Sequence, residues 1–149
     1  MKITCGIWLI NNRKEILFTH PTYHPEKFHT IPKGLIDKGE TEMEAAKREL
    51  FEETNISWDQ IKEFITNITE LTIKPYNHGK KSLKSFVVEC DSDLEFLDLK
   101  CEFMVTSHKW APFPEVDGFV WKTLDGSRND LDLHHTHIMC FKELEDILG

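Results

Sequence analysis

Two short apolar stretches begin the chain. Residues 3–10 and 15–19 are rich in β-branched and aromatic side chains and have the length of strands. The four residues between them are two asparagines, an arginine and a lysine, a composition typical of turns. The pattern therefore predicts a strand, a turn and a returning strand at the start of the chain.

Helical spacing replaces this pattern after residue 40. Thr41 and Glu44 form an S/T-x-x-E capping box, which satisfies two amide donors that would otherwise be free at a helix start. Asn55 stands where helices often end on a left-handed residue, a conformation that Asn tolerates. The side expected to face a core is made by Met43, Ala46, Leu50 and Thr54. We therefore predict a helix over residues 41–54.

Further strands and a closing helix are predicted downstream. Residues 64–76 and 83–89 have strand composition and are separated by a turn at 77–80, whereas residues 58–61 are predicted to begin a connector. Residues 133–148 are predicted as a helix because apolar residues recur there at helical spacing. A solvated cluster that could flank a substrate is predicted for the histidines near its start, His134, His135 and His137.

Length and charge limit the classes of partner. The 149 residues contain no repeat, low-complexity tract or linker, so a single domain over residues 1–149 is expected. The formal net charge of −8 disfavours a surface that coats a long nucleic acid. It permits a small phosphorylated substrate, because metal ions can carry the positive charge.

Membrane and redox signals are absent from the sequence. The longest apolar stretch, residues 3–10, is too short to span a bilayer, and the N-terminus does not resemble a signal peptide. Four scattered cysteines without metal-binding spacing are predicted to be reduced thiols, mostly buried. We therefore expect a cytoplasmic protein with no membrane partner.

Three carboxylates gather on one side of the predicted helix. At about 100° per residue, Glu49, Glu52 and Glu53 fall within one arc of roughly 100°. Their mutual repulsion costs roughly a few tenths of a kcal/mol per pair. A bound hard cation would reverse that cost, because Mg²⁺ and Mn²⁺ prefer clustered oxygen ligands. The alternative is a solvated acidic face, which Arg48 supports because it can pair with Glu44 and Glu52.

The glycine-bearing loop before the helix favours the metal site. From this loop onward the sequence resembles the Nudix box, G-x5-E-x7-R-E-U-x-E-E-x-G-U, in which U is a bulky aliphatic residue. The matching residues are Gly34, Glu40, Arg48, Glu49, Leu50, Glu52, Glu53 and Ile56. Asn55 replaces the last glycine, a conservative change for the backbone reason given above. The resemblance implies a Nudix hydrolase, an α/β protein with an α/β/α sandwich and a mixed β-sheet.

A second segment adds a carboxylate from outside the box. Residues 114–121 are similar to the P-E-F-D-G-W-x-W segment of bacterial RNA pyrophosphohydrolases and dinucleoside polyphosphate hydrolases, with Val116 and Phe119 as departures. The metal ligands that the two resemblances imply are the Gly34 carbonyl, Glu40, Glu49, Glu52, Glu53 and Glu115. The implied cofactor is Mg²⁺, with Mn²⁺ as an alternative. Glu115 or Glu49 would take a proton from the attacking water, and Arg48 would orient the glutamates.

Three further residues are predicted to contact the substrate. Lys33 adjoins the carboxylates, and Lys81 begins a strand similar to one in diadenosine tetraphosphate hydrolases of this family, so both are candidates for phosphate contacts. Tyr76 is a candidate for a base contact, and histidines in the loop over residues 20–29 are expected near the cleft. A purely structural role is the alternative for each.

The implied reaction is hydrolysis of a nucleoside diphosphate linked to another moiety. Dinucleoside polyphosphates are the preferred substrates on the sequence evidence. The alternatives are a 5′-phosphorylated RNA end, ADP-ribose, nucleoside triphosphates, and a non-catalytic domain that only binds nucleotides.

Overall fold

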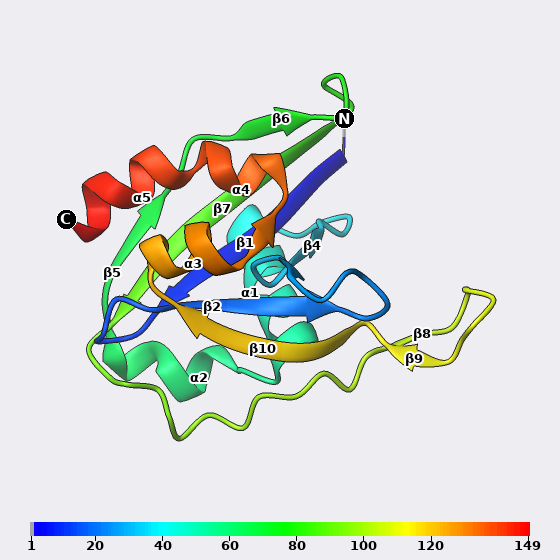
Figure 1. Ribbon diagram of the computed structural model, residues 1–149, viewed down its shortest axis with the longest axis horizontal. Helices are drawn as coiled ribbons and strands as arrows, with labels where there is room; N and C mark the ends of the chain where they lie inside the picture. The colour runs from blue at the N-terminus through cyan, green and yellow to red at the C-terminus, as the bar shows by residue number, and fades with distance from the viewer. Residues whose placement is uncertain (1) are drawn as a thin grey trace.

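A seven-stranded mixed sheet forms the middle layer of the protein in a computed structural model that describes residues 2–149 (Figure 1). Its main path is β10 (Val116–Lys122), β2 (Ile16–Pro21), β1 (Lys2–Ile10), β7 (Lys81–Cys90) and β5 (Ile65–Glu70). Two short strands add to it, β4 (Lys33–Leu35) beside β1 and β6 (Lys74–Tyr76) beside β7. β1 and β7 run parallel and the other pairs of this sheet are antiparallel, so the sheet is mixed.

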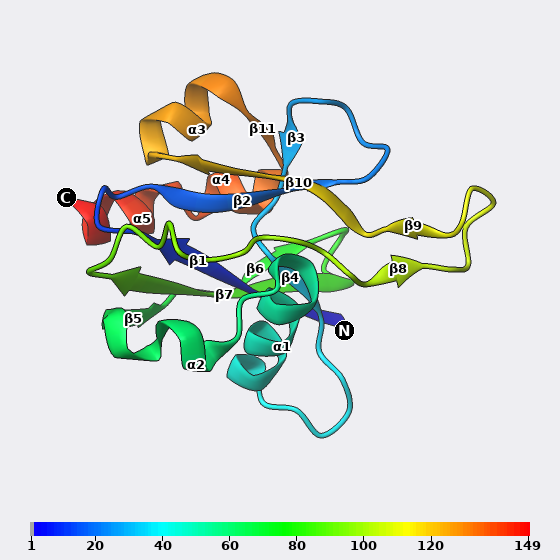
Figure 2. The same ribbon diagram turned by 90° about the horizontal axis from the view of Figure 1, so that it is seen from below.

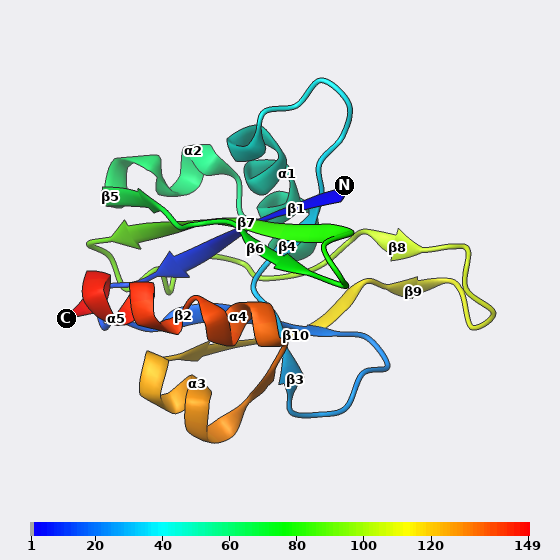
Figure 3. The ribbon, with the colours of Figure 1, turned by 90° about the horizontal axis from the view of Figure 1, so that it is seen from above.

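Helices cover both faces of this sheet (Figures 2 and 3). One face carries α1 (Glu42–Thr54) and α2 (Trp58–Ile61), which continues into a short 3₁₀ turn, η1 (Lys62–Phe64). The other face carries α3 (Leu124–Asp130), α4 (His135–Met139) and α5 (Phe141–Leu148). The expected α/β/α sandwich with a mixed sheet is confirmed. Among residues 2–149, no helix has the length and hydrophobicity needed to cross a bilayer.

β1 connects the two halves of the core because its side chains alternate between the two faces of the sheet. Ile7 and Leu9 pack into the cluster that contains Leu50 of α1. Trp8 packs into the cluster that contains Leu144 of α5. The two apolar layers on either side of β1 therefore place α1 at a defined position relative to the sheet.

The limits of α1 follow from its local sequence. Thr41 Oγ1 accepts a hydrogen bond from Glu44 N at 3.1 Å, and Glu44 Oε1 accepts one from Thr41 N at 2.9 Å. Asn55 adopts the left-handed conformation with φ 68° and donates its N–H to the Phe51 carbonyl. The predicted capping box, the helix over 41–54 and the left-handed end at Asn55 are confirmed.

Two long predicted elements are interrupted. The strand predicted over 64–76 is split into β5 and β6, because four residue steps from Glu70 to Lys74 face three steps on β7, which forces a bulge. Between them the N–H and hydroxyl of Thr72 donate to the Glu143 carboxylate on α5. The helix predicted over 133–148 is divided at Cys140 into α4 and α5.

Three small elements surround the site. β3 (Phe28–His29) pairs with β11 (Asp132–Leu133), and β8 (Met104–Val105) pairs with β9 (Phe113–Pro114). The sequence pattern did not predict α3, β8 or β9. Residues 58–61, predicted as the beginning of a connector, form the short helix α2.

The four cysteines are free thiols, as predicted. Cys5, Cys90 and Cys140 are buried and Cys101 is half-buried. Burial raises the pKa of Cys5, Cys90 and Cys140 to about 11, so these side chains stay protonated near neutral pH. They act as small packing groups in the core.

The predicted solvated histidine cluster is wrong for His137. His135 is exposed and His134 is half-buried, but His137 is 0 % exposed because α4 packs it against the sheet. Its Nε2 accepts a hydrogen bond from Ile31 N at 3.2 Å, and its ring lies edge-on to Trp8 at 5.5 Å. Burial lowers the pKa of His137 well below its usual value, so the folded protein holds this ring neutral.

We expect the stability that His137 contributes to depend on pH. The unfolded chain protonates this ring near its ordinary pKa of 6.5, whereas the folded chain does not. Its contribution is therefore present above pH 6.5 and is lost below it, by at most about 1.4 kcal/mol per pH unit. His137→Gln keeps an acceptor for Ile31 but cannot titrate. Urea denaturation at pH 7.5 and 5.5 should show the wild-type advantage shrinking at pH 5.5; an equal advantage at both would contradict a buried neutral ring.

Candidate active site

The tightest packing in the candidate site is between Gly34 and Glu49. Gly34 lies in β4 and pairs with Cys5 of β1, which holds the loop backbone against α1. A Cβ atom at Gly34 would lie 2.1 Å from the carboxyl carbon of Glu49, far closer than atoms can approach. Only glycine leaves room for this carboxylate, so the first residue of the box and its central glutamate depend on each other sterically.

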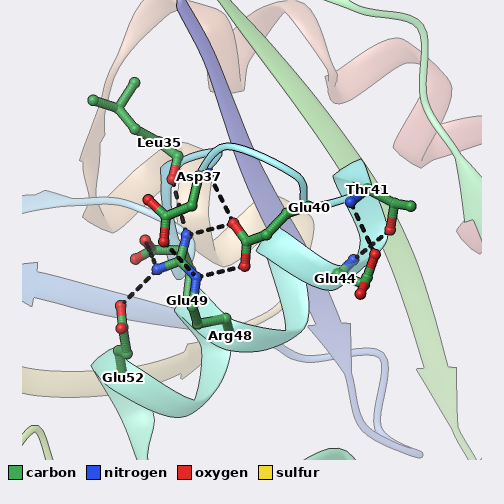
Figure 4. A network of polar contacts seen from close by, with 8 residues as sticks. All are labelled: Leu35, Asp37, Glu40, Thr41, Glu44, Arg48, Glu49 and Glu52. Carbon is green, nitrogen blue, oxygen red and sulfur yellow. Dashed lines mark hydrogen bonds and ion pairs between the residues drawn. The ribbon is translucent and has the colours of Figure 1, made fainter.

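Arg48 joins the loop to the helix through a network of hydrogen bonds (Figure 4). Its Nε and Nη2 donate to the two carboxylate oxygens of Glu40, at 2.7 and 3.0 Å. Its Nη1 donates to Glu49 Oε1 at 2.8 Å and to Glu52 Oε2 at 3.0 Å, and Nη2 also reaches the Leu35 carbonyl. Arg48 therefore contacts three glutamates at once, a geometry suited to orienting them.

Glu40 is fully engaged by this network. Its Oε1 also accepts a hydrogen bond from Asp37 N at 2.8 Å. Arg48, followed by this backbone donor, lowers the pKa of Glu40. Glu40 is therefore a counter-ion of Arg48 in this structure, and it would have to release Arg48 to reach a metal. Glu44, the other predicted partner of Arg48, bonds instead to Thr41 at the helix start.

Glu49 and Glu53 are buried carboxylates, only 7 % and 4 % exposed. Burial raises the pKa of Glu49 to about 7; Glu52 adds to this effect and the Arg48 hydrogen bond opposes it. Burial likewise raises the pKa of Glu53 well above its usual value, and the negative charges of Glu115 and Glu49 raise it further. Strongly perturbed carboxyl groups are a feature of functional sites.

A cavity of about 290 Å³ opens beside Glu53. Its lining combines carboxylates, a lysine and rings: Thr19, Pro21, His24, Phe28, Thr30, Lys33, Glu53, Glu115, Val116 and His134. The structure thus brings three predicted site residues, Lys33, Glu53 and Glu115, to one cavity, although they come from β4, α1 and the β9–β10 junction. Glu115 is exposed at the rim, yet shielding of its carboxyl group by the walls, together with Glu52, raises its pKa.

An aromatic face lines the same cavity. The rings of His24 and Phe28 are stacked with centroids 5.2 Å apart and planes 21° apart. The loop over residues 20–29 therefore lies at the cleft, as expected from the sequence. Phe28 supplies a ring one position before the site where the family often has tryptophan and this chain has His29.

Tyr76 and Lys81 lie outside this cavity. The Tyr76 hydroxyl is 3.2 Å from Thr4 Oγ1, and its ring packs edge-on against His134. The adjacent hollow measures about 40 Å³, which holds one or two water molecules but not a nucleobase. Lys81 lines a separate surface hollow with Lys2 and Lys80. The structure does not bring these two predicted substrate contacts to the carboxylates.

The sequence analysis missed a group of rings beside the cavity. Trp110 and Phe113 from the β8–β9 hairpin meet Tyr23 from the loop after β2, with His108 next to them. The available signal was a high density of aromatic residues over 103–113 without helical or strand periodicity. We refer to Tyr23, His108, Trp110 and Phe113 as the aromatic cluster.

The carboxylates have the chemistry of a divalent-cation site. Within residues 2–149, no three histidine, cysteine, aspartate or glutamate side chains are arranged to hold a metal ion in this conformation, in which Arg48 already engages Glu49 and Glu52. The donor set nevertheless fits a hard cation, because its side chains are carboxylates and positive charge would offset the burial of Glu49 and Glu53.

Comparisons with known proteins agree with this geometry. NAD-capped RNA hydrolases NudC of Citrobacter koseri and Escherichia coli O1:K1 / APEC are 29 % identical to this chain over 96 residues, or 64 % of it. The chain spans about a third of the length of these relatives, since the match covers 35 % of each. The structure of a C. elegans Ap4A hydrolase matches with TM-score 0.68 at 23 % identity over 97 % of both chains.

A further structure shares the fold. The NUDIX domain of Shewanella oneidensis NrtR, complexed with ADP ribose, matches with TM-score 0.66 at 15 % identity over 99 % of this chain and 88 % of that one. The family model of the NUDIX domain matches residues 2–131. The chain therefore belongs to the NUDIX domain family, which confirms the resemblance seen in the box.

Proposed function

We propose that this protein is a Mg²⁺-dependent pyrophosphohydrolase of nucleoside diphosphates linked to another moiety, with dinucleoside polyphosphates as preferred substrates. The observation that carries the proposal is the buried pair Glu49 and Glu53 beside the Gly34 backbone, at the wall of a cavity that also contains Lys33 and Glu115. The names of similar proteins, which refer to NAD-capped RNA, Ap4A and ADP-ribose, are consistent with this class.

The carboxylates would hold the cation. The proposed ligands of Mg²⁺ (or Mn²⁺) are the Gly34 carbonyl, Glu49, Glu52, Glu53 and Glu115, with Glu40 joining only after it releases Arg48. When bound, the ion supplies positive charge that offsets the charge of the pyrophosphate and of the leaving phosphate. Arg48 keeps Glu49 and Glu52 oriented toward each other.

The remaining roles follow from where the side chains lie. Lys33 places an ammonium group in the cavity, where it would bind phosphate oxygens. Glu115 lines the same cavity from the β9–β10 junction, and its raised pKa suits a group that accepts a proton from the attacking water. Glu49, with a pKa of about 7, is the alternative base, but it is held by Arg48 and packed against Gly34. We therefore assign the proton to Glu115.

An RNA 5′ end is the second candidate substrate. A surface hollow lined by Lys2, Lys80 and Lys81 could receive a polyanion that continues beyond the cavity. The net charge of −8 opposes such binding over a longer stretch, so we rank RNA below dinucleoside polyphosphates.

A substrate panel tests the proposal. The purified protein with Mg²⁺ is incubated separately with diadenosine tetraphosphate, ADP-ribose, NAD, ATP and a 5′-triphosphate RNA oligonucleotide. The products are identified by mass spectrometry in ¹⁸O-labelled water. We expect the highest kcat/KM for diadenosine tetraphosphate, with the label in the product whose phosphorus was attacked. Binding without hydrolysis of any compound would instead indicate a non-catalytic nucleotide-binding domain.

Glu115→Gln should lower kcat by about 10²–10⁴-fold and change KM little, because the amide cannot accept the proton but still fits the cavity rim. Steady-state kinetics on the best substrate of the panel measure both constants. Glu102→Gln is the matched control, since Glu102 is exposed in the neighbouring segment and does not line the cavity. An unchanged kcat in Glu115→Gln would remove Glu115 from the site.

A further inference from the structure

The aromatic cluster is built from two segments far apart in the sequence. The Tyr23 ring lies 4.8 Å from Phe113 and 5.2 Å from Trp110, and His108 lies 5.0 Å from Trp110, measured between ring centroids. The loop after β2 and the β8–β9 hairpin extend from the same end of the sheet in both views (Figures 2 and 3). Tertiary folding therefore assembles four rings at one end of the molecule.

These rings are unusually open to solvent. Tyr23 is 61 % and Trp110 is 56 % exposed. They border a hollow of about 470 Å³. Large aromatic side chains around a concavity, instead of within the core, are typical of binding sites.

The hollow is continuous with the cavity that contains the carboxylates. Pro21, His24 and Glu115 line both of them. A ligand that reaches from Glu53 past Glu115 would therefore meet the aromatic cluster next. The 40 Å³ hollow at Tyr76 offers no comparable space on its side of the cavity.

The chemistry of the cluster selects a flat, anionic ligand. Exposed Trp and Tyr rings stack well on nucleobases and do so with little sequence preference. The Lys109 ammonium lies 4.9 Å from the Trp110 ring centroid, which adds positive charge beside the rings. In a protein of net charge −8, this lysine is a local exception that suits a phosphate-bearing group.

We propose that the aromatic cluster binds the second nucleoside of a dinucleoside polyphosphate. One nucleoside and the scissile phosphates occupy the cavity with Lys33 and Glu53, the polyphosphate passes Glu115, and the second base stacks on Trp110 and Tyr23. This inference rests on the proposed function and assigns its preference for two-base substrates to specific residues.

The test compares two ligands that differ only in the second nucleoside, diadenosine tetraphosphate and adenosine 5′-tetraphosphate. Trp110→Ala should raise KM for the first by about 5- to 100-fold, the range expected for loss of one stacking partner. It should leave kcat/KM for the second unchanged, and Trp110→Phe should restore most of the affinity. Phe96→Ala is the matched control, because Phe96 is similarly exposed but lines neither the hollow nor the cavity.

Equal effects on both ligands, or no effect on either, would overturn the inference; the second result would point to a protein-docking role for the rings. A fluorescence titration separates this failure from failure of the hydrolase proposal. The difference between wild type and Trp110→Phe reports Trp110 alone. Quenching by diadenosine tetraphosphate but not by adenosine tetraphosphate supports the binding site even if no nucleotide is hydrolysed. Hydrolysis without this difference retains the enzyme and rejects the site.

Discussion

Glu53→Gln is expected to abolish turnover and to stabilise the protein at pH 8 when no divalent ion is present. Loss of one metal ligand at a charged transition state should cost roughly 10²–10³-fold in kcat. The substitution also removes a buried negative charge that Glu115 and Glu49 repel. The opposite signs of the two effects distinguish a functional carboxylate from a structural one.

The pH dependence follows from the raised pKa of Glu53. A raised pKa means that the folded state favours the protonated acid, so the stability that this group contributes is present below pH 4.5 and is lost as pH rises through the raised value. The neutral amide does not lose it. Thermal denaturation in a chelator should therefore give the variant a higher Tm than wild type at pH 8, with the gap closing toward pH 5.

Mg²⁺ should reverse this order. An ion that binds the folded state raises Tm by mass action, and it should do so more in wild type than in Glu53→Gln. Glu63→Gln is the control, because Glu63 is exposed in η1 and should change neither activity nor the response to Mg²⁺. Near-wild-type rates in Glu53→Gln, or an equal Mg²⁺ response in both proteins, would contradict the ligand assignment.

Gly34→Ala is expected to disable the enzyme through a steric conflict with Glu49. Gly34 does not have a positive φ, so its backbone conformation is open to alanine and the added methyl group is the only cost. That methyl group would lie 2.1 Å from the Glu49 carboxyl carbon, and the carboxylate must move away. We expect kcat to fall by about 10²-fold from the displaced carboxylate, and the free energy of unfolding to fall by about 1–3 kcal/mol.

A double-mutant cycle isolates this contact. In a protein that carries Glu49→Ala, the Gly34→Ala change should cost little further stability, because the carboxylate that it would strike is gone. Gly118→Ala is the matched control, since its added methyl group would sit 3.5 Å from His20 Cβ, an ordinary contact. Urea denaturation and steady-state kinetics measure both quantities. Additive costs in the double variant would show that Gly34 and Glu49 do not interact.

Elements that depend on near neighbours in the chain were predictable. The start of α1 is set by Thr41 and Glu44, three residues apart, and its end by the conformational tolerance of Asn55. The carboxylates at 49, 52 and 53 share one side of α1 because helix geometry alone places them there. The box spacing identified the family for the same reason, since a loop followed by a helix repeats the same local geometry.

Contacts that depend on how the elements pack were decided only by the tertiary structure. Glu40 was a predicted metal ligand, but the folded loop places it on Arg48, which nothing in the local pattern indicates. His137 was expected in solvent and is buried, because α4 packs against Trp8 and Ile31.

Strand order decided the shape of the substrate cleft. Pairing of β10 with β2 sets Val116 opposite Pro21, and this register brings Glu115 and the β8–β9 hairpin beside the loop that carries Tyr23. The sequence by itself determined the carboxylate-bearing helix and its loop, because short-range hydrogen bonds and helical spacing are encoded locally. Only the sheet topology decided which distant side chains complete the cleft, because residues separated by some 90 positions meet through packing and not through sequence pattern.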